Sequence, residues 1–198
     1  MTYRLALCTL AIPLAFVTFA ETSNIVKRKK KAKSPVTAQR SIPRKQAKPA
    51  VVNPYSVVID KSDYELQVFD AEGWLATYPV VFGNKNQADK RMSGDRLTPE
   101  GSFRITSKRG QYKWGCILGL DYPNAESLAK FRRRVANGEV PAGASPGGDI
   151  AIHGTWPGSD WVVDNYINWT EGCISLKNTD VEELFEMLPV GTRVTIKK

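Results

Sequence analysis

Short β-rich runs separated by turn residues fill the chain from residue 56 to its end, and this pattern constrains its fold more than any other feature. Residues 56–60 and 64–70 are followed by a turn at 70–73 and a returning run at 74–82, which together predict a β-hairpin. Further strand candidates lie at residues 102–107, 114–120, 149–153, 173–176 and 193–197. Because the runs do not alternate with helices as βαβ units do, we predict a mainly-β domain.

Two accessory helices are expected to interrupt the strands. The first covers residues 125–137 and is followed by Gly138, a residue suited to end a helix. The second is predicted by a capping box of Thr179 and Glu182, with Pro189 as its stop. Both carry apolar side chains at helical spacing: Leu128, Phe131 and Val135 in the first, and Val181, Leu184, Phe185 and Leu188 in the second.

Charge is divided unevenly along the 198 residues, whose net charge is +8. Residues 21–50 carry ten lysines and arginines against one glutamate, a net of +9, with several prolines and no apolar period. Residues 51–198 carry 17 basic and 19 acidic side chains, a net of −2. A nucleic-acid-binding domain would carry its basic excess on the folded part. We therefore predict a disordered basic linker at 21–50, a folded domain at 51–198 and no nucleic-acid partner.

The first 20 residues have the pattern of a secretory signal. Arg4 gives the start a positive charge, and residues 5–19 are apolar. Thr18 and Ala20 are the small residues expected before a cleavage site. The pattern predicts export to the periplasm or cell envelope, with an uncleaved anchor as the alternative. The basic linker would then contact an anionic envelope surface or act as a solvated tether.

One histidine and three cysteines limit the chemistry that the chain can support. The single His153 excludes zinc sites built from several imidazoles, and the lack of a CxxC pair excludes zinc ribbons and thioredoxin-like sites. His153 ends one apolar run, and Cys173 begins another directly after Gly172. A nucleophilic cysteine needs a base, and backbone N–H groups for the developing oxyanion. The alternatives are a structural histidine and cysteine, or a disulfide between Cys116 and Cys173.

Four segments in order resemble the L,D-transpeptidase (YkuD-type) catalytic domain family. They are residues 57–83, TPEGSF at 98–103, GGDIAIHGT at 147–155 and WTEGCISLKN at 169–178. The resemblance covers about residues 55–198, and its most specific part is the ordered pair of His-Gly and Thr-x-Gly-Cys. It implies a YkuD-type, β-sandwich-like domain with the two accessory helices. The T-E-G-C-I-S motif is similar to that of a murein-modifying branch of the family.

The resemblance also implies a role for each motif residue. Cys173 matches the nucleophile that forms an acyl-thioester, and His153 matches the imidazole that activates it. Gly172 and Cys173 match the turn that provides the oxyanion hole, and residues 98–101 match a turn that shapes the fold nearby. The other motif residues are candidates for substrate contact: Gly154, Trp169, Thr170, Glu171, Ser175 and Asn178.

Two positions depart from the family pattern. Glu171 stands where many members have a histidine, and Ser175 stands where many have an arginine that is thought to help hold substrate. Because the branch with an acidic and a small residue here includes hydrolases, transfer and hydrolysis both stay open. Residues 154–170 are rich in tryptophan and tyrosine, and they form either a lid that contacts glycan or peptide or an ordinarily packed loop.

The function implied by the resemblance is that of an exported cysteine enzyme, an L,D-transpeptidase, which acts on peptidoglycan stem peptides without a metal or organic cofactor. Cys173 would attack the third stem residue, and His153 would keep the thiol largely as thiolate. The acyl group would pass to an amine in cell-wall cross-linking or remodelling, or to water in a murein L,D-amidase or carboxypeptidase. A non-catalytic peptidoglycan-binding module is the further alternative. We expect a monomer.

Overall fold

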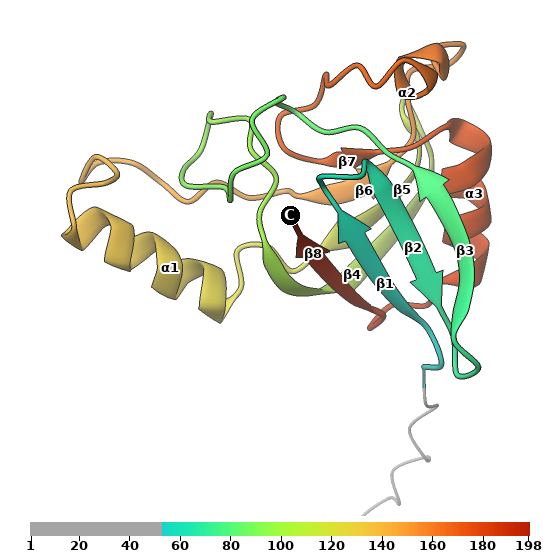
Figure 1. Cartoon of the computed structure of the whole chain (residues 1–198), viewed down its shortest axis with the longest axis horizontal. Coiled ribbons are helices and arrows are strands. Elements are labelled where there is room, and N and C mark those ends of the chain that lie inside the picture. Colours follow the sequence, from blue (N-terminus) through green and yellow to red (C-terminus); the bar gives the residue numbers. More distant parts are fainter. Residues whose placement is uncertain (1–52) are drawn as a thin grey trace, which may run out of the picture. The chain divides into compact units, whose positions relative to one another are not determined.

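The computed structural model describes residues 53–198, and the predicted signal and linker at 1–50 lie outside the described residues. The strands are β1 (Ser56–Asp60), β2 (Glu65–Phe69), β3 (Trp74–Pro79), β4 (Gly101–Tyr112), β5 (Gly115–Leu120), β6 (Ala151–His153), β7 (Ile174–Ser175) and β8 (Arg193–Lys197). The helices are α1 (Ala125–Ala136), α2 (Trp161–Asp164) and α3 (Asn178–Met187) (Figure 1). None of these helices is both long and apolar enough to cross a membrane.

All the strands join one mixed sheet in the order β3-β2-β1-β8-β4-β5-β6-β7, which confirms the mainly-β prediction. The predicted hairpin is present as the antiparallel pair of β2 and β3. The pairs β1–β8 and β6–β7 are parallel, and the other pairs are antiparallel. Strand β4 serves two partners, because its first residues pair with β8 and those from Ile105 onward pair with β5.

The two ends of this sheet meet, which explains why β3 is shorter than predicted. The predicted strand ran to residue 82, but β3 ends at Pro79. Val81 then turns to β7, where it exchanges two backbone hydrogen bonds of 2.9 Å with Ser175. The short strand β7 is therefore held on one side by β6 and on the other by the segment after β3. The apolar core lies inside the curved sheet and under α3, and it includes Ile59, Leu118, Ile174 and Leu184.

Helix α1 begins where predicted, ends one residue before the predicted 137, and has little burial. Asn124 caps its start by accepting a 3.0 Å hydrogen bond from the N–H of Ser127. Gly138, with a φ of +70°, follows its end. No residue of the helix is fully buried, and Figure 1 shows it at the margin of the domain. Its apolar stripe therefore contributes little to the main core.

Helix α3 is present, but the predicted capping box is wrong. Lys177 is the N-cap residue, and Thr179 lies inside the helix, where its hydroxyl contacts Asp180. The N–H of Asn178 is satisfied instead by the carboxylate of Asp160, 3.1 Å away. Asp160 precedes α2, a third helix that was not predicted because four residues are too few to show a helical period. A carboxylate from a distant loop thus replaces the local cap.

Candidate functional site

Parallel strands β6 and β7 bring the two motifs together. Their register pairs His153 with Ser175. Cys173 directly precedes β7 and stands two residues before Ser175. Because side chains alternate along an extended chain, we expect the thiol on the face that carries Ser175 and His153.

The cysteine turn, residues 170–173, is closed by the side chain of its first residue. Thr170 Oγ1 donates to the Cys173 carbonyl at 2.8 Å and accepts from the Gly172 N–H at 3.2 Å. Gly172 has a φ of +121°, and a Cβ there would lie 2.7 Å from a backbone oxygen of the neighbouring loop, so only glycine fits. Thr98 Oγ1 donates to the Gly172 carbonyl at 2.9 Å. The predicted fold-shaping segment therefore contacts the cysteine turn directly.

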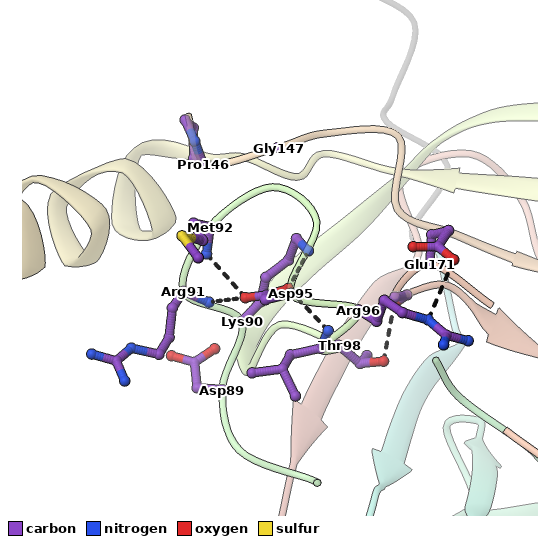
Figure 2. Close-up of polar contacts among 12 residues, drawn as sticks. Asp89, Lys90, Arg91, Met92, Asp95, Arg96, Thr98, Pro146, Gly147 and Glu171 are labelled. Atoms are coloured by element: carbon purple, nitrogen blue, oxygen red, sulfur yellow. Dashed lines mark hydrogen bonds and ion pairs between the residues drawn. The ribbon is translucent and has the colours of Figure 1, made fainter. Parts of the chain in front are cut away.

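The loop just before Thr98 supports this turn, and sequence analysis did not find its main residues. The carboxylate of Asp95 accepts hydrogen bonds from three backbone N–H groups of the loop at 2.7 to 3.0 Å. It also forms an ion pair at 2.8 Å with Nζ of Lys90, whose side chain is 3% exposed (Figure 2). Ser93-Gly94 is a turn signal in the sequence, but it does not indicate what the turn packs against.

Buried contacts fix the imidazole of His153. Its Nδ1 lies 2.7 Å from the Gly154 carbonyl oxygen, which also accepts a 3.2 Å hydrogen bond from Ser175 Oγ. Because a carbonyl only accepts, Nδ1 carries the proton and Nε2 is the basic nitrogen. The ring packs against Trp114 and Trp169, with centroid distances of 5.4 and 5.6 Å. Burial lowers the pKa of His153, and the Gly154 hydrogen bond opposes this shift.

The thiol of Cys173 is also favoured in its uncharged form. Its Sγ donates to the Asp149 carbonyl oxygen at 3.4 Å. Burial raises the pKa of the thiol and the charge on Asp149 adds to this, whereas a backbone hydrogen bond from Ala151 and the charge on Lys90 lower it. Both shifts favour the uncharged thiol and imidazole, whereas the sequence predicted a resting thiolate. Cys116 and Cys173 are both thiols, so the disulfide between them is wrong.

Most of the other motif residues make their contacts inside the protein. Gly154 has no room for a side chain, since a Cβ would lie 2.3 Å from Asn178 Oδ1. Asn178 Nδ2 donates to Thr155 Oγ1 at 2.9 Å and to Asp160 Oδ1 at 3.0 Å. Four of the predicted substrate contacts thus make their polar or close contacts within the protein: Gly154, Thr170, Ser175 and Asn178.

Glu171 is the exposed member of the motif. Its side chain is 78% exposed, and its Oε1 lies 3.3 Å from Nε of Arg96 (Figure 2). The same Nε donates to the Thr170 carbonyl oxygen at 3.3 Å. Arg96, which was not predicted, is therefore attached to the cysteine turn by its side chain.

The aromatic segment between the motifs is only partly packed. Trp156, Trp161 and Tyr166 are 45%, 56% and 54% exposed. Trp156 nevertheless packs edge-on against Trp114, with a centroid distance of 5.7 Å, and Trp114 lies against the imidazole. A contact surface and an ordinarily packed loop both stay predictions for this segment.

Comparison with known proteins identifies related sequences. Residues 54–196 match the model of the L,D-transpeptidase catalytic domain, YkuD. The chain is 30% identical over 148 residues to "Putative L,D-transpeptidase YqjB" of Bacillus subtilis (strain 168), which covers 73% of this chain and 71% of that protein. It is 25% identical over 155 residues to "Probable L,D-transpeptidase YcfS" of Escherichia coli (strain K12), which covers 71% of this chain and 43% of that protein.

Solved structures share the fold. The helical cell shape determining protein Pgp2 of Campylobacter jejuni matches with a TM-score of 0.54 and 24% identity, over 74% of this chain and 48% of Pgp2. Bd1075 of Bdellovibrio bacteriovorus matches with a TM-score of 0.52 and 20% identity, over 73% of this chain and 48% of Bd1075. The chain therefore spans less than half of Pgp2, Bd1075 and YcfS. Since the family model covers most of its length, the chain belongs to the L,D-transpeptidase catalytic domain family.

Proposed function

We propose that this chain is an exported L,D-transpeptidase that forms an acyl-thioester on Cys173 with peptidoglycan stem peptides. The observation that carries the proposal is the β6–β7 register, which pairs the chain's single histidine with Ser175, two residues after Cys173. Membership of the family supports the reaction class. Every residue invoked comes from one chain, so a monomer suffices, and no cofactor is required by the chemistry.

The first half of the reaction forms the thioester. Sγ of Cys173 attacks the carbonyl carbon of the third stem residue, a diamino acid, while Nε2 of His153 takes the thiol proton. The bond from that carbon to the nitrogen of the fourth, D-configured residue then breaks. His153 returns the proton to the leaving amine, so the imidazole is neutral again.

The second half transfers the acyl group. An amine from another stem attacks the thioester carbon, and His153 accepts the proton that the amine loses. The carbon–sulfur bond breaks, the sulfur regains the proton and a 3–3 cross-link is formed. Water in place of the amine gives a shortened stem and makes the protein an L,D-amidase or carboxypeptidase. The Glu171 and Ser175 motif positions, which match a branch with hydrolases, favour keeping this second candidate.

We assign the hydrogen bond to the developing oxyanion mainly to the backbone N–H of Cys173. The N–H of Gly172 already donates to Thr170 Oγ1 at 3.2 Å, so it would have to leave that bond to contact the substrate. We assign Thr170 to holding the turn, and Ser175 to orienting His153 through the shared Gly154 carbonyl. These are positioning roles in place of the substrate contacts implied by the resemblance.

Product masses test the proposal and separate its alternatives. The purified protein is incubated with a disaccharide-tetrapeptide, and the products are read by mass spectrometry. A dimer that has lost one fourth residue supports transfer, whereas a disaccharide-tripeptide supports hydrolysis. Cys173→Ala should give neither product. Peptide binding without any product from the wild type would overturn the enzyme proposal and leave a peptidoglycan-binding module.

A further inference from the structure

An open pocket of about 410 Å³ lies next to the cysteine turn. Gly83, one of its lining residues, is so close to the turn that a Cβ would lie 2.5 Å from the Thr170 carbonyl oxygen and 2.8 Å from the Gly172 nitrogen. Arg96 lines the pocket as well, and its Nε donates to that same Thr170 carbonyl. The pocket therefore borders the turn that carries Cys173.

The charged side chains that line this pocket are both basic, and Glu171, outside the lining, pairs with one of them. Lys85 and Arg96 are the charged side chains among its lining residues, and the others are Gly83, Asn84, Asn165, Tyr166, Ile167 and Asn168. Backbone and amide groups thus surround two cations, with no acidic side chain in the lining. Such a lining suits an anionic group of a peptide better than an apolar one.

The pocket is also built rigidly. Asn168 accepts a 2.7 Å hydrogen bond from the Phe82 N–H and donates to the Tyr64 hydroxyl at 2.9 Å and the Asn84 carbonyl at 3.1 Å. Backbone strain gathers in the same area. In the described part of the chain, the non-glycine residues with left-handed backbone are Tyr64, Arg96, Asp149 and Tyr166, with φ from +52° to +58°. Two of them line the pocket, a third packs on Tyr166, and the fourth accepts from the Cys173 thiol.

We propose that this pocket binds the terminal carboxylate of the tetrapeptide stem, with Arg96 as its principal ligand. The inference rests on the proposed function, because it places the scissile carbonyl at Cys173. Only one nitrogen and one Cα separate that carbonyl from the carboxylate of the fourth residue. The carboxylate must therefore lie close to the cysteine turn, where the guanidinium of Arg96 is held.

Without substrate, the carboxylate of Glu171 forms an ion pair with the guanidinium of Arg96. The two side chains are 43% and 78% exposed, and an exposed ion pair contributes little free energy. Exchanging the Glu171 carboxylate for that of the substrate therefore costs little, and the planar guanidinium can then bind the new carboxylate through two N–H groups. Glu171 is therefore a weak competitor of the substrate carboxylate for Arg96.

A pair of matched peptides tests this assignment. The tetrapeptide stem with a free terminal carboxylate and the same peptide with a terminal carboxamide are titrated into Cys173→Ala protein by calorimetry, so that no turnover interferes. We expect the acid to bind on the order of 10-fold more tightly than the amide, the value of one charge-assisted contact. Adding Arg96→Gln should abolish this preference, and Arg96→Lys should keep only part of it. Glu171→Gln should strengthen binding of the acid by a few-fold.

Arg91→Gln is the matched control. Its side chain is similarly exposed and pairs with Glu139, outside this pocket. It should leave the preference for the acid unchanged, and alkylation of Cys173 by neutral iodoacetamide in the single Arg96→Gln variant checks that the turn is intact. Equal affinity for acid and amide, or a preference that survives Arg96→Gln, would overturn the inference. If the wild type also converts neither peptide, the proposed function fails; if it converts both equally, only the carboxylate assignment fails.

Discussion

Burial favours the uncharged forms of Cys173 and His153, so we expect the imidazole to act as a base during attack rather than as a counter-ion that holds a thiolate at rest. The pKa of the thiol is raised and that of the imidazole is lowered, both mainly by burial. Raising the first and lowering the second moves the proton toward sulfur. The wild-type rate should therefore fall only when acidification protonates His153, below its ordinary pKa of about 6.5.

Replacing the base should change this pH profile. His153→Gln should lower the rate of Cys173 acylation at pH 7 by about 10²- to 10⁴-fold, because a general base contributes about that much. The variant should then regain rate as the pH rises toward 9, since its thiol must ionise unaided. The measurement is acylation by a carbapenem from pH 6 to 9, read by intact mass. Parallel profiles for the two proteins would show that His153 does not act as the base.

Thr170 offers a test of the turn that carries the nucleophile. Thr170→Val keeps the shape of the side chain but removes the hydroxyl bonds to Cys173 and Gly172, so we expect a loss of about 2 kcal/mol in stability, at about 1 kcal/mol per bond. Activity should fall further than stability explains, because the turn positions Sγ. Thr170→Ser keeps the hydroxyl and should retain most of both. Denaturant unfolding and acylation rates provide the comparison, and equal behaviour of the two variants would contradict the assignment.

At the scale of elements, the start of α3 depends on a residue far from it in the sequence. Asp160 Oδ1 accepts hydrogen bonds from Thr155 Oγ1 at 2.5 Å and from the backbone and side-chain nitrogens of Asn178 at 3.1 and 3.0 Å. This one carboxylate therefore joins α2, α3 and the segment after His153. Losing it should loosen the helix and the site together.

Asp160→Ala should lower the free energy of unfolding by about 2 to 3 kcal/mol, since a cap and charged hydrogen bonds are lost. For a domain of this size that is a fall in Tm of roughly 6 to 10 °C. Thr179→Ala is the control, because Thr179 would be the cap in the predicted capping box but lies inside the helix. It should shift Tm by less than about 2 °C. A larger fall in Tm for Thr179→Ala than for Asp160→Ala would show that Thr179 caps the helix after all.

The elements that sequence predicted correctly are those with local causes. The turn of the β2–β3 hairpin is set by residues within it, since Asp70 and Gly73 share a 2.8 Å backbone hydrogen bond. Helix α1 likewise begins and ends at residues adjacent to it. Asp160 and Asp95 could not be found in this way, because their partners are chosen by tertiary packing. The two motifs indicated Cys173 and His153, yet gave no indication of Arg96, which reaches the turn from another loop.

At the scale of the whole molecule, the central strands of the sheet are tied to the loop that supports the site. Parallel pairing of β1 with β8 joins the first and last strands of the described domain. At the end of β1, Lys61 is 1% exposed, forms an ion pair with Glu100 at 2.7 Å and donates to the Thr98 carbonyl at 3.3 Å. A buried lysine has no signature in sequence, so this tie was not predictable. It anchors the loop whose Thr98 holds the cysteine turn.

The predicted basic linker should matter for access to the cell wall and not for chemistry. The candidate site is built from residues between 81 and 178, whereas residues 21–50 carry a net charge of +9. Deleting residues 21–50 with the signal retained should leave kcat/KM on a soluble tetrapeptide within about twofold of the wild type. Binding to intact sacculi should weaken, and the difference should shrink as salt screens exposed charges beyond about 8 Å. Replacing the lysines and arginines of 27–33 with glutamine at constant length separates charge from reach. A large loss of activity on the small soluble peptide would show that the linker belongs to the catalytic domain.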